Sequence, residues 1–429
     1  MIAMLTVAII TIALFLLSVL FLPSIGKKKK IKIYSWIPLI GSFFMIAIGD
    51  LGISDVFNAF TENSTVNPLK ILILFLSMTV YSLILDKTGF FRYISGIVLK
   101  KSGHNQFIIF LSLYSVIAVL TVFTSNDIVI LTFTPFICNF CRAAKIDVIP
   151  YLIMEFVVAN TWSLFLLIGN PTNIYIAGAF NISFTDYFVN MAFPTIAAGL
   201  VSLALMLLLF GKKLRKPVDT HTEIEQVNDK PLMIVSLAHL FGCIVLLAVS
   251  QYTGMEMWLI SFAMSISAIV CSLAILIFRH KSIAPVGLAL KGMPFEIIPF
   301  VIGMFIIVMG LDLAGVTGAI SEAMGIGDGV LTYGLASLFS SNFLNNIPMS
   351  VLFSKILLVT PSMPEIYATI AGSNIGAFLT PVGALAGIMW SNLVKKNNVK
   401  LSVGKFVSYG MAIGIPTMLA SLFVIMLVV

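Results

Sequence analysis

Apolar runs long enough to cross a lipid bilayer recur along the whole of this chain. A transmembrane helix needs about 20 consecutive, mostly apolar residues. Hydrophobic residues make up 59% of the 429 residues, and charged residues make up only 10%. Because every backbone polar group inside a bilayer must be satisfied within the chain, runs of this length fold as helices. The sequence therefore predicts an all-α polytopic membrane protein.

Ten runs are predicted as spans, with approximate limits 2–23, 33–53, 68–86, 148–180, 188–210, 231–250, 256–278, 296–314, 364–394 and 404–428. Two further regions, 106–143 and 330–360, are too long for one span. Each has a polar cluster at its centre, "TSND" at 124–127 and "SSNFLNN" at 340–346. We expect two re-entrant hairpins, because a chain can turn inside a membrane only where its backbone is buried in protein or lines a wet cavity.

The distribution of lysine and arginine predicts the orientation. If both termini lie outside, all of the 25 basic residues except Lys70 and Lys355 fall in or beside cytoplasmic connections. Acidic residues such as Asp186 and Glu256 then fall in outer loops. Cytoplasmic loops carry this excess of basic residues in helical membrane proteins. We therefore expect the first hairpin to open from the cytoplasm, the second from the exterior, and the protein to lie in the cytoplasmic (inner) membrane.

A polar loop at 211–230 separates two similar halves, 1–210 and 231–429. "LILDKTGFF" in the first half matches "GLDLAGVTG" in the second, and "SNDIV" matches "LNNIP". The matches align Asp86 with Asp312, Gly89 with Gly315, Asn126 with Asn345, and Asp127 with Asn346. Each half holds five spans and a hairpin, and the odd number of spans inverts the second half. Inverted repeats with a substrate near the midplane are typical of secondary transporters.

A second interruption follows each hairpin. "GNPTN" breaks the span at 148–180, and "GSNIGAFLTPVG" breaks the span at 364–394. Broken helices leave free backbone groups and helix ends that can hold a solute; alternatively, such small and polar residues serve only helix packing. We predict that the interruptions and hairpin tips bind substrate through Ser125, Asn126, Asp127, Asn170, Pro171, Thr172, Asn173, Asn345, Asn346, Ser373, Asn374, Thr380 and Gly383.

Four stretches carry a resemblance to a known family. "LDKTGFF", "SNDIVILTFTP", "NNIPMS" and "GSNIGAFLTPVGALAGIMW" resemble the arsenite efflux permease family, within the ion transporter superfamily that also holds citrate and dicarboxylate carriers and sodium/proton antiporters. The resemblance covers the chain from about residue 35 to its end. It implies an elevator mechanism and a homodimer. The "GNPTN" segment departs from the arsenite branch and is more familiar from the carboxylate and sodium/proton branches, which leaves the substrate open.

Asp127 is the residue on which the predicted chemistry depends. A carboxylate inside a membrane is a functional candidate by default, and its natural role is to carry a coupling proton. An ionised carboxylate would repel a dianion unless a cation or proton neutralised it, whereas neutral arsenite or antimonite suits a ring of amides and hydroxyls. A sodium ion would also suit Asp127 with backbone oxygens. The structural alternative is a hairpin tip that caps the following half-helix.

Glu155 is a second intramembrane acid of the first half. It is predicted either to relay the coupling proton or to pair with Arg142 or Lys145 near the interface. The four cysteines, Cys138, Cys141, Cys243 and Cys271, lie in or beside apolar segments and are expected to serve in packing.

These features favour one of three classes of function. A secondary transporter explains the repeats and the polar breaks. The second class is a membrane-embedded enzyme that uses Asp127, but the sequence contains no recognisable catalytic motif. The third class is a passive channel, whose flux would not saturate as that of a carrier does. No phosphate-binding loop occurs, so the energy is expected from a proton or sodium gradient, or from a separate ATPase subunit. We expect no cofactor and no nucleic-acid partner, only the lipid bilayer and a small inorganic or carboxylate solute.

Overall fold

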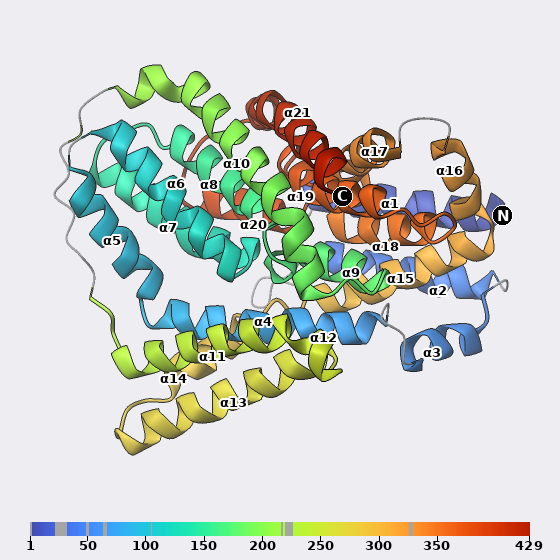
Figure 1. Cartoon of the computed structure of the whole chain (residues 1–429), viewed down its shortest axis with the longest axis horizontal. Helices are drawn as coiled ribbons and strands as arrows, with labels where there is room; N and C mark the ends of the chain where they lie inside the picture. The colour runs from blue at the N-terminus through green and yellow to red at the C-terminus, as the bar shows by residue number, and fades with distance from the viewer. Residues whose placement is uncertain are drawn as a thin grey trace.

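The computed structural model describes residues 2–21, 32–48, 51–62, 67–103, 105–215, 218, 226–325 and 329–429. Its regular elements, over these residues, are helices (Figure 1). Seven of the described helices are long and apolar enough to cross a membrane, and α15 (Ile297–Leu313) with α16 (Val316–Met324), bent by 77°, would make an eighth. The seven are α1 (Ile2–Phe21), α4 (Pro68–Lys87), α6 (Gln106–Phe123), α10 (Phe184–Leu214), α11 (Lys230–Ala248), α13 (Met257–Phe278) and α21 (Val403–Val428). The expectation of an all-α polytopic membrane protein is confirmed.

The remaining elements are shorter, except α7, which is as long as α6 but less apolar. In the first half they are η1 (Ile33–Ser35), α2 (Ile37–Ala47), α3 (Ile53–Thr61), α5 (Phe90–Ser102), α7 (Asn126–Ala143), α8 (Ile149–Trp162), η2 (Leu167–Gly169) and α9 (Pro171–Ala179). In the second half they are α12 (Ser250–Thr253), α14 (Ala284–Lys291), α17 (Gly329–Leu344), α18 (Asn346–Leu357), α19 (Met363–Ile375), η3 (Gly376–Phe378) and α20 (Leu385–Lys396).

The span predicted at 33–53 is wrong as a single helix. The structure divides it into η1, α2 and the start of α3, and α2 has only 11 residues. A new helix begins after Gly52, because the Asp55 carboxylate accepts a hydrogen bond from the Gly52 N–H at 3.0 Å and so caps α3. Residues 49 and 50 of the predicted span lie outside the described part of the chain.

The predicted interruptions are present in the structure. The 106–143 segment turns at Thr124 and Ser125 between α6 and α7, and the 330–360 segment turns at Asn345 between α17 and α18. The 148–180 segment consists of α8, η2 and α9, and the 364–394 segment consists of α19, η3 and α20. Each polar cluster named from the sequence therefore lies where a helix stops and another begins.

Elements of the two halves pack on one another as well as within each half. α4 lies against α11 and α13, while α15 lies against α1 and α2 (Figure 1). The Tyr81 hydroxyl of α4 donates to the Ser261 carbonyl of α13 at 3.1 Å, and the rings of Phe15 and Phe300 join α1 to α15 at 5.3 Å. Similarly, α20 packs on α7 and α9 packs on α18. The arrangement brings each break next to the opposite hairpin.

The turns that follow α4 and α15 have the same backbone conformation. Gly89 has φ +79° and Gly315 has φ +75°, in the left-handed region that glycine adopts without strain. The aspartate before each turn contacts the second arm of a hairpin. Asp86 Oδ1 accepts from Thr132 Oγ1 at 3.2 Å, and Asp312 Oδ2 lies 3.4 Å from Lys355 Nζ. These aspartates therefore join the ends of α4 and α15 to α7 and α18.

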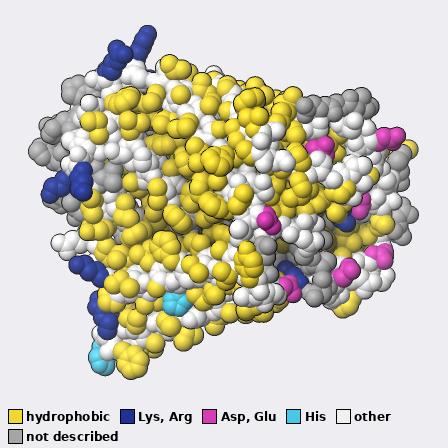
Figure 2. All heavy atoms as spheres, in the orientation of Figure 1, with side chains coloured by type: hydrophobic (Ala, Val, Ile, Leu, Met, Phe, Trp, Pro, Cys, Tyr) yellow, Lys and Arg dark blue, Asp and Glu magenta, His cyan; other side chains and the backbone are white. Residues whose placement is uncertain are grey.

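The surface has a wide apolar band and charged ends. Figure 2 shows hydrophobic side chains over most of the visible face, with most lysine and arginine at one end and most acidic side chains towards the other. The basic end includes the last turn of α10, with Lys212 and Lys213, and Arg279 after α13. The apolar band includes Leu208, which is 80% exposed. Apolar surface of this extent marks a lipid-facing protein.

Asp229 joins the basic ends of α11 and α13. It caps α11 by accepting from the Leu232 N–H at 3.1 Å, and it also accepts from Arg279 at 2.6 Å and Lys281 at 2.7 Å. Burial by itself would raise the pKa of Asp229, but the hydrogen bonds from Lys281, the Leu232 N–H and Arg279 outweigh burial and hold that pKa below its ordinary value.

Asp229→Asn is expected to lower the free energy of unfolding by about 1–3 kcal/mol at neutral pH, because charge-assisted bonds are lost. Since the folded-state pKa is depressed, the stabilisation is present above the unfolded-state pKa and disappears as the pH falls through the folded-state pKa. Thermal unfolding of the purified protein should therefore show a gap between wild type and variant at pH 7 that closes in acid. Asp147→Asn, at an exposed ion pair with Lys213, is the control and should change little; an equal shift would contradict the assignment.

Candidate functional site

The two broken helices come together at their interruptions. α9 begins with Pro171, which lacks a backbone donor but needs none in the first turn of a helix. Asn170 caps this helix, since its Oδ1 accepts from the Thr172 N–H at 3.1 Å. In the second half, α19 runs to Ile375 and places Ser373 and Asn374 in its last turn. The cap of α9 and the end of α19 thus face each other.

Asn374 is the centre of the contact. Its Oδ1 accepts from Ser163 Oγ and from Asn170 Nδ2, each at 2.9 Å, and its Nδ2 donates to Asn173 Oδ1 at 2.7 Å. Beside it, the hydroxyls of Thr172 and Ser373 are 3.0 Å apart. All of these side chains are 1% exposed or less. They form a buried polar network, which we call the amide strut: Ser163, Asn170, Thr172, Asn173, Ser373 and Asn374.

The amide strut changes the interpretation of five predicted substrate residues. The structure brings Asn170, Thr172, Asn173, Ser373 and Asn374 together, but their side chains satisfy one another. In the conformation described here, they connect the two halves and present no free group to a solute. Ser163 was missed from the sequence, although it lies in the turn that directly follows α8.

The tip of the first hairpin is joined to α8. Asn126 Nδ2 donates to Asn160 Oδ1 at 3.1 Å, and Asn126 Oδ1 accepts from the Asp127 N–H at 2.9 Å. Asn160, also missed from the sequence, lies one turn before Ser163, and the Ser163 Oγ lies 2.9 Å from the Asn160 carbonyl oxygen as a second acceptor. The hairpin tip is therefore connected through the end of α8 to the amide strut.

The tip of the second hairpin is joined to the second break. Asn345 has φ +74° and donates from Nδ2 to the Val382 carbonyl at 3.0 Å, while the Asn346 N–H donates to the Gly383 carbonyl at 2.9 Å. Thr380 donates to Asn342 Oδ1 at 2.7 Å. A Cβ at Gly383 would lie 2.8 Å from that same oxygen and 3.0 Å from the Gly376 carbonyl oxygen, so a larger residue would displace the Asn342 side chain and press on the backbone of the break. Thr380 and Gly383 therefore hold the break against the hairpin.

Three polar groups of the predicted set have no hydrogen-bond partner among the described residues. They are the Ser125 hydroxyl, the Asp127 carboxylate and the Asn346 side-chain amide. Ser125 is 7% exposed and Asn346 is 3% exposed. Buried polar groups are normally paired, so groups left free at helix starts are the ones available to a ligand. Within the described chain, the groups of this set without a protein partner are thus at the hairpin tips, whereas the polar side chains in the breaks are paired with other side chains.

The charges that act on Asp127 come from Lys32 and Glu296. Lys32, which directly precedes η1, and Glu296, which directly precedes α15, form an ion pair with each other. The nearby positive charge is therefore already compensated by Glu296. With Asp127, Lys32 and Glu296 all ionised, the region around the first hairpin tip carries one net negative charge.

Glu155 is a fully buried carboxyl held by two neutral donors. Thr134 Oγ1 of α7 donates to Oε1 at 2.7 Å, and Trp390 Nε1 of α20 donates to Oε2 at 3.1 Å. The expected alternative, an ion pair with Arg142 or Lys145, is wrong: Arg142 donates to the Asn397 carbonyl at 2.9 Å instead, and no ion pair of Glu155 exists within the described residues. Trp390 belongs to the second half of the chain, so its contact with Glu155 could not be predicted from the sequence around Glu155.

Trp390→Phe is expected to lower the free energy of unfolding by about 1–3 kcal/mol, because one oxygen of the buried carboxyl loses its donor while the aromatic packing on Phe156 is kept. The matched control is Trp258→Phe, which removes the same indole–carboxylate bond from Glu256, an exposed residue. Thermal unfolding in detergent should separate the two variants. Equal stability of both would show that the bond to Glu155 contributes nothing.

A cavity of about 260 Å³ is lined by Trp390, whose indole donates to this carboxyl. We call it the Trp390 cavity; it lies between the second break, α20 and the start of α21, with Lys395 and Ser402 among its lining. Pro381 and Val382, next to the tip of the second hairpin, also line it. Trp390 therefore separates Glu155 from a cavity that reaches the second break.

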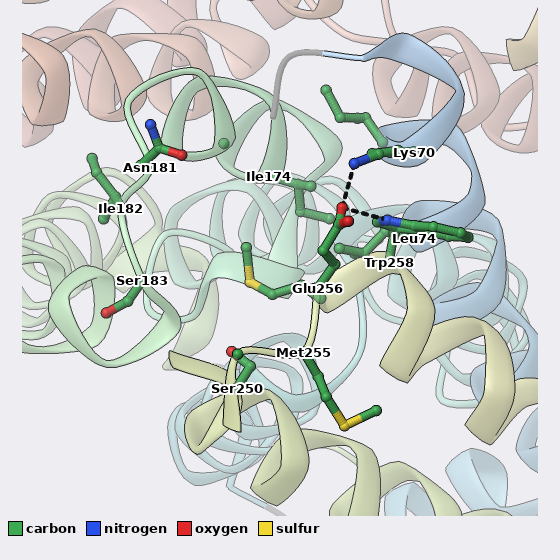
Figure 3. A pocket seen from close by; sticks show the side chains of 14 residues that line it. Lys70, Leu74, Ile174, Asn181, Ile182, Ser183, Ser250, Met255, Glu256 and Trp258 are labelled. Carbon is green, nitrogen blue, oxygen red and sulfur yellow. Dashed lines mark hydrogen bonds and ion pairs between the residues drawn. The ribbon is translucent and has the colours of Figure 1, made fainter. Parts of the chain in front are cut away.

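A second cavity, of about 300 Å³, lies between the start of α4, the α9–α10 connection and the α12–α13 turn (Figure 3). Lys70 and Glu256 form an ion pair there, and Trp258 Nε1 donates to Glu256 Oε2 at 2.7 Å. The hydrogen bond from Lys70 holds the pKa of Glu256 below its ordinary value. The rest of the wall is mostly apolar, and none of the predicted substrate residues line this cavity.

Comparison with known proteins gives the chain relatives over nearly its full length. The citrate transporter family model matches residues 2–368. An arsenical pump membrane protein of Escherichia coli is 25% identical over 430 residues, covering 96% of each chain. A putative arsenical pump membrane protein of Bacillus subtilis (strain 168) is 22% identical, covering 86% of this chain and 88% of its own. Among solved structures, the Alcanivorax borkumensis YdaH transporter matches with a TM-score of 0.55 at 12% identity, covering 99% of this chain and 97% of its own, which indicates a shared fold.

Proposed function

This chain belongs to the citrate transporter family, and we propose that within it the protein exports arsenite or antimonite across the cytoplasmic membrane in exchange for protons. Membership makes the chain a secondary transporter of the ion transporter superfamily and not an enzyme. Such transport uses an ion gradient and needs no cofactor. The substrate and the coupled ion are the parts that we propose.

The observation that carries the proposal is the unpaired carboxylate at the first hairpin tip. Asp127 has a free hydroxyl beside it at Ser125, and the ion pair of Lys32 with Glu296 leaves no spare positive charge nearby. A net negative site in a low-dielectric environment disfavours a dianion. Trihydroxy acids of trivalent arsenic and antimony are neutral near pH 7 and can both donate to and accept from such groups. The relatives named arsenical pump membrane proteins support this substrate.

The second candidate is a carrier that moves a carboxylate or another anion together with cations. The family description favours it, since its name is citrate transporter. A bound cation or proton at Asp127 would remove the repulsion that a citrate or dicarboxylate would otherwise meet. The third candidate function is sodium/proton exchange, with Asp127 as the ion-binding carboxylate.

We further propose that the two halves are inverted repeats and that transport follows an elevator mechanism in a homodimer. The matching turns at Gly89 and Gly315, the exchanged packing of α4 and α15, and the joining of each hairpin to a break all support this. The separation of charge along the molecule supports both termini lying outside (Figure 2). An ATPase subunit, if one takes part, would dock on the cytoplasmic side at 211–230.

Asp127 and Glu155 have different proposed roles in coupling. Asp127 carries the exchanged proton at the first hairpin tip. Glu155 is enclosed by Thr134 and Trp390, and Trp390 also lines the Trp390 cavity, which would be the route of a proton to Glu155 from the basic, cytoplasmic end. This makes Glu155 a second proton site on the inner side.

The test is accumulation of arsenite by inside-out vesicles that contain the protein, with and without an imposed proton gradient. Export from a cell corresponds to uptake into these vesicles, so we expect saturable arsenite accumulation that stops when an ionophore collapses the gradient. Vesicles without the protein are the control. Citrate, succinate and sodium are assayed in the same vesicles.

Each outcome decides between the candidates. Gradient-driven arsenite uptake without citrate or succinate uptake supports arsenite export. Carboxylate uptake without arsenite uptake overturns it in favour of the second candidate. Sodium movement alone, in exchange for protons, would favour the antiporter. Uptake that does not saturate and shows no exchange would argue against a carrier of any kind.

A further inference from the structure

Two cysteines of α7 stand at Cys-x-x-Cys spacing. Cys138 and Cys141 are separated by three positions, so their side chains lie on one side of the helix. Both thiols are free and buried. The sequence expectation treated all four cysteines as packing residues and overlooked this spacing. Cys243 and Cys271, in contrast, stand alone on α11 and α13.

A cavity of about 430 Å³ adjoins the pair. Cys138 lines it together with Arg142, Ile149 and the connection between α20 and α21 at 397–400. Arg142 crosses to this connection and donates to the Asn397 carbonyl at 2.9 Å. The cavity lies at the basic end of the molecule, which is the cytoplasmic side in the proposed orientation. A small neutral solute could reach Cys138 there without entering the hairpin tips.

The number of ligands limits what such a pair can hold. Structural zinc sites use four ligands and catalytic sites use three. The described residues contain no group of three or more His, Cys, Asp or Glu placed to hold a metal ion. Trivalent arsenic differs because it is soft, prefers thiols and needs only three bonds, one of which can remain to hydroxide. A dithiol without further protein ligands therefore suits arsenic and not zinc.

We propose that Cys138 and Cys141 form a binding site for trivalent arsenic on the cytoplasmic side of the protein. The choice of trivalent arsenic as the ligand of this site rests on the proposed function. One arsenous acid condenses with the two thiols, forming two As–S bonds, keeping one As–OH bond and releasing two waters. No oxidation or reduction is involved. The site lies on the same helix as Asp127, at the opposite end.

The first experiment uses phenylarsine oxide, which joins two neighbouring thiols with release of one water. The purified full-length protein is treated in detergent and its intact mass is measured. We expect one adduct per chain that withstands excess glutathione, a monothiol, and is removed by dimercaptopropanol, a dithiol. The Cys243→Ala/Cys271→Ala double variant, which keeps the pair, should form the same adduct. Cys138→Ala and Cys141→Ala should form none that withstands glutathione.

A second experiment on the wild-type chain avoids dependence on the variants folding. Sodium arsenite should slow maleimide labelling of Cys138 and Cys141 at least about tenfold and leave labelling of Cys271 unchanged. No stable adduct in monodisperse wild-type protein, or an adduct that survives in both single variants, would overturn the proposal. Adduct formation and protection in a protein whose vesicles take up no arsenite would leave the dithiol site standing and reject the proposed transport.

Discussion

An Asp127→Asn protein is expected to lose proton-driven arsenite accumulation completely while still exchanging arsenite across the membrane. The amide resembles the protonated carboxyl in size and hydrogen bonding but cannot release a proton. The backbone conformation at residue 127 should persist in the variant. It is held by the hydrogen bond from the Asp127 N–H to Asn126 Oδ1, which does not involve the Asp127 side chain. Substrate can therefore still bind, whereas the exchange of substrate for a proton is removed.

The measurement separates two fluxes in the same inside-out vesicles. Net uptake is followed with an imposed proton gradient, and exchange is followed with arsenite on both sides and no gradient. We expect net uptake at the level of protein-free vesicles and exchange within a few fold of wild type. Asp147→Asn, which alters an exposed ion pair with Lys213, should keep both fluxes. Gradient-driven uptake that survives in Asp127→Asn would move the coupling role elsewhere, with Glu155→Gln as the next variant.

Asn374→Ala is expected to abolish transport through loss of structure. The substitution leaves Asn170 Nδ2 and Asn173 Oδ1 without their bonds to this side chain in a buried position, whereas the Ser163 hydroxyl can still donate to the Asn160 carbonyl. Each buried polar group left unsatisfied costs about 1–3 kcal/mol, so the combined loss should be about 3 kcal/mol or more. That is a large part of the stability of an ordinary protein domain.

Thermal unfolding and size-exclusion profiles of the purified variant would measure this loss. Asn392→Ala is a matched control, since Asn392 is exposed on α20, and it should unfold like wild type. A stable, monodisperse Asn374→Ala protein without transport would contradict the structural role and return Asn374 to the substrate site. Full transport by that variant would contradict both roles.

The position of Asn160 illustrates where sequence reasoning stopped. Asn126 was singled out because it stands in a polar cluster within an apolar run, and the structure places it at a helix start. Its partner Asn160 lies within the regular helix α8, where nothing in the sequence separates it from other polar helix residues. The same holds for Thr134 and Trp390, whose relation to Glu155 depends on three helices meeting.

The amide strut shows why clusters were found more easily than their roles. A polar residue in a bilayer-length apolar run is conspicuous, since it must be satisfied by something. One segment of sequence does not show whether the hydrogen-bond partner of that residue is a solute or another side chain. Asn170 and Asn374 are 204 residues apart, and only their meeting in space reveals that they satisfy each other.

The sequence by itself determined the membrane-spanning helical class and four of the places where helices break, although not the break within 33–53, because the bilayer imposes a length and a polarity on every span. The tertiary structure alone decided which polar groups are paired and which remain free at Ser125, Asp127 and Asn346. The reason is physical: burial and hydrogen bonding are properties of contacts between distant segments, and the exchange of α4, α15, α9 and α20 between the halves sets those contacts.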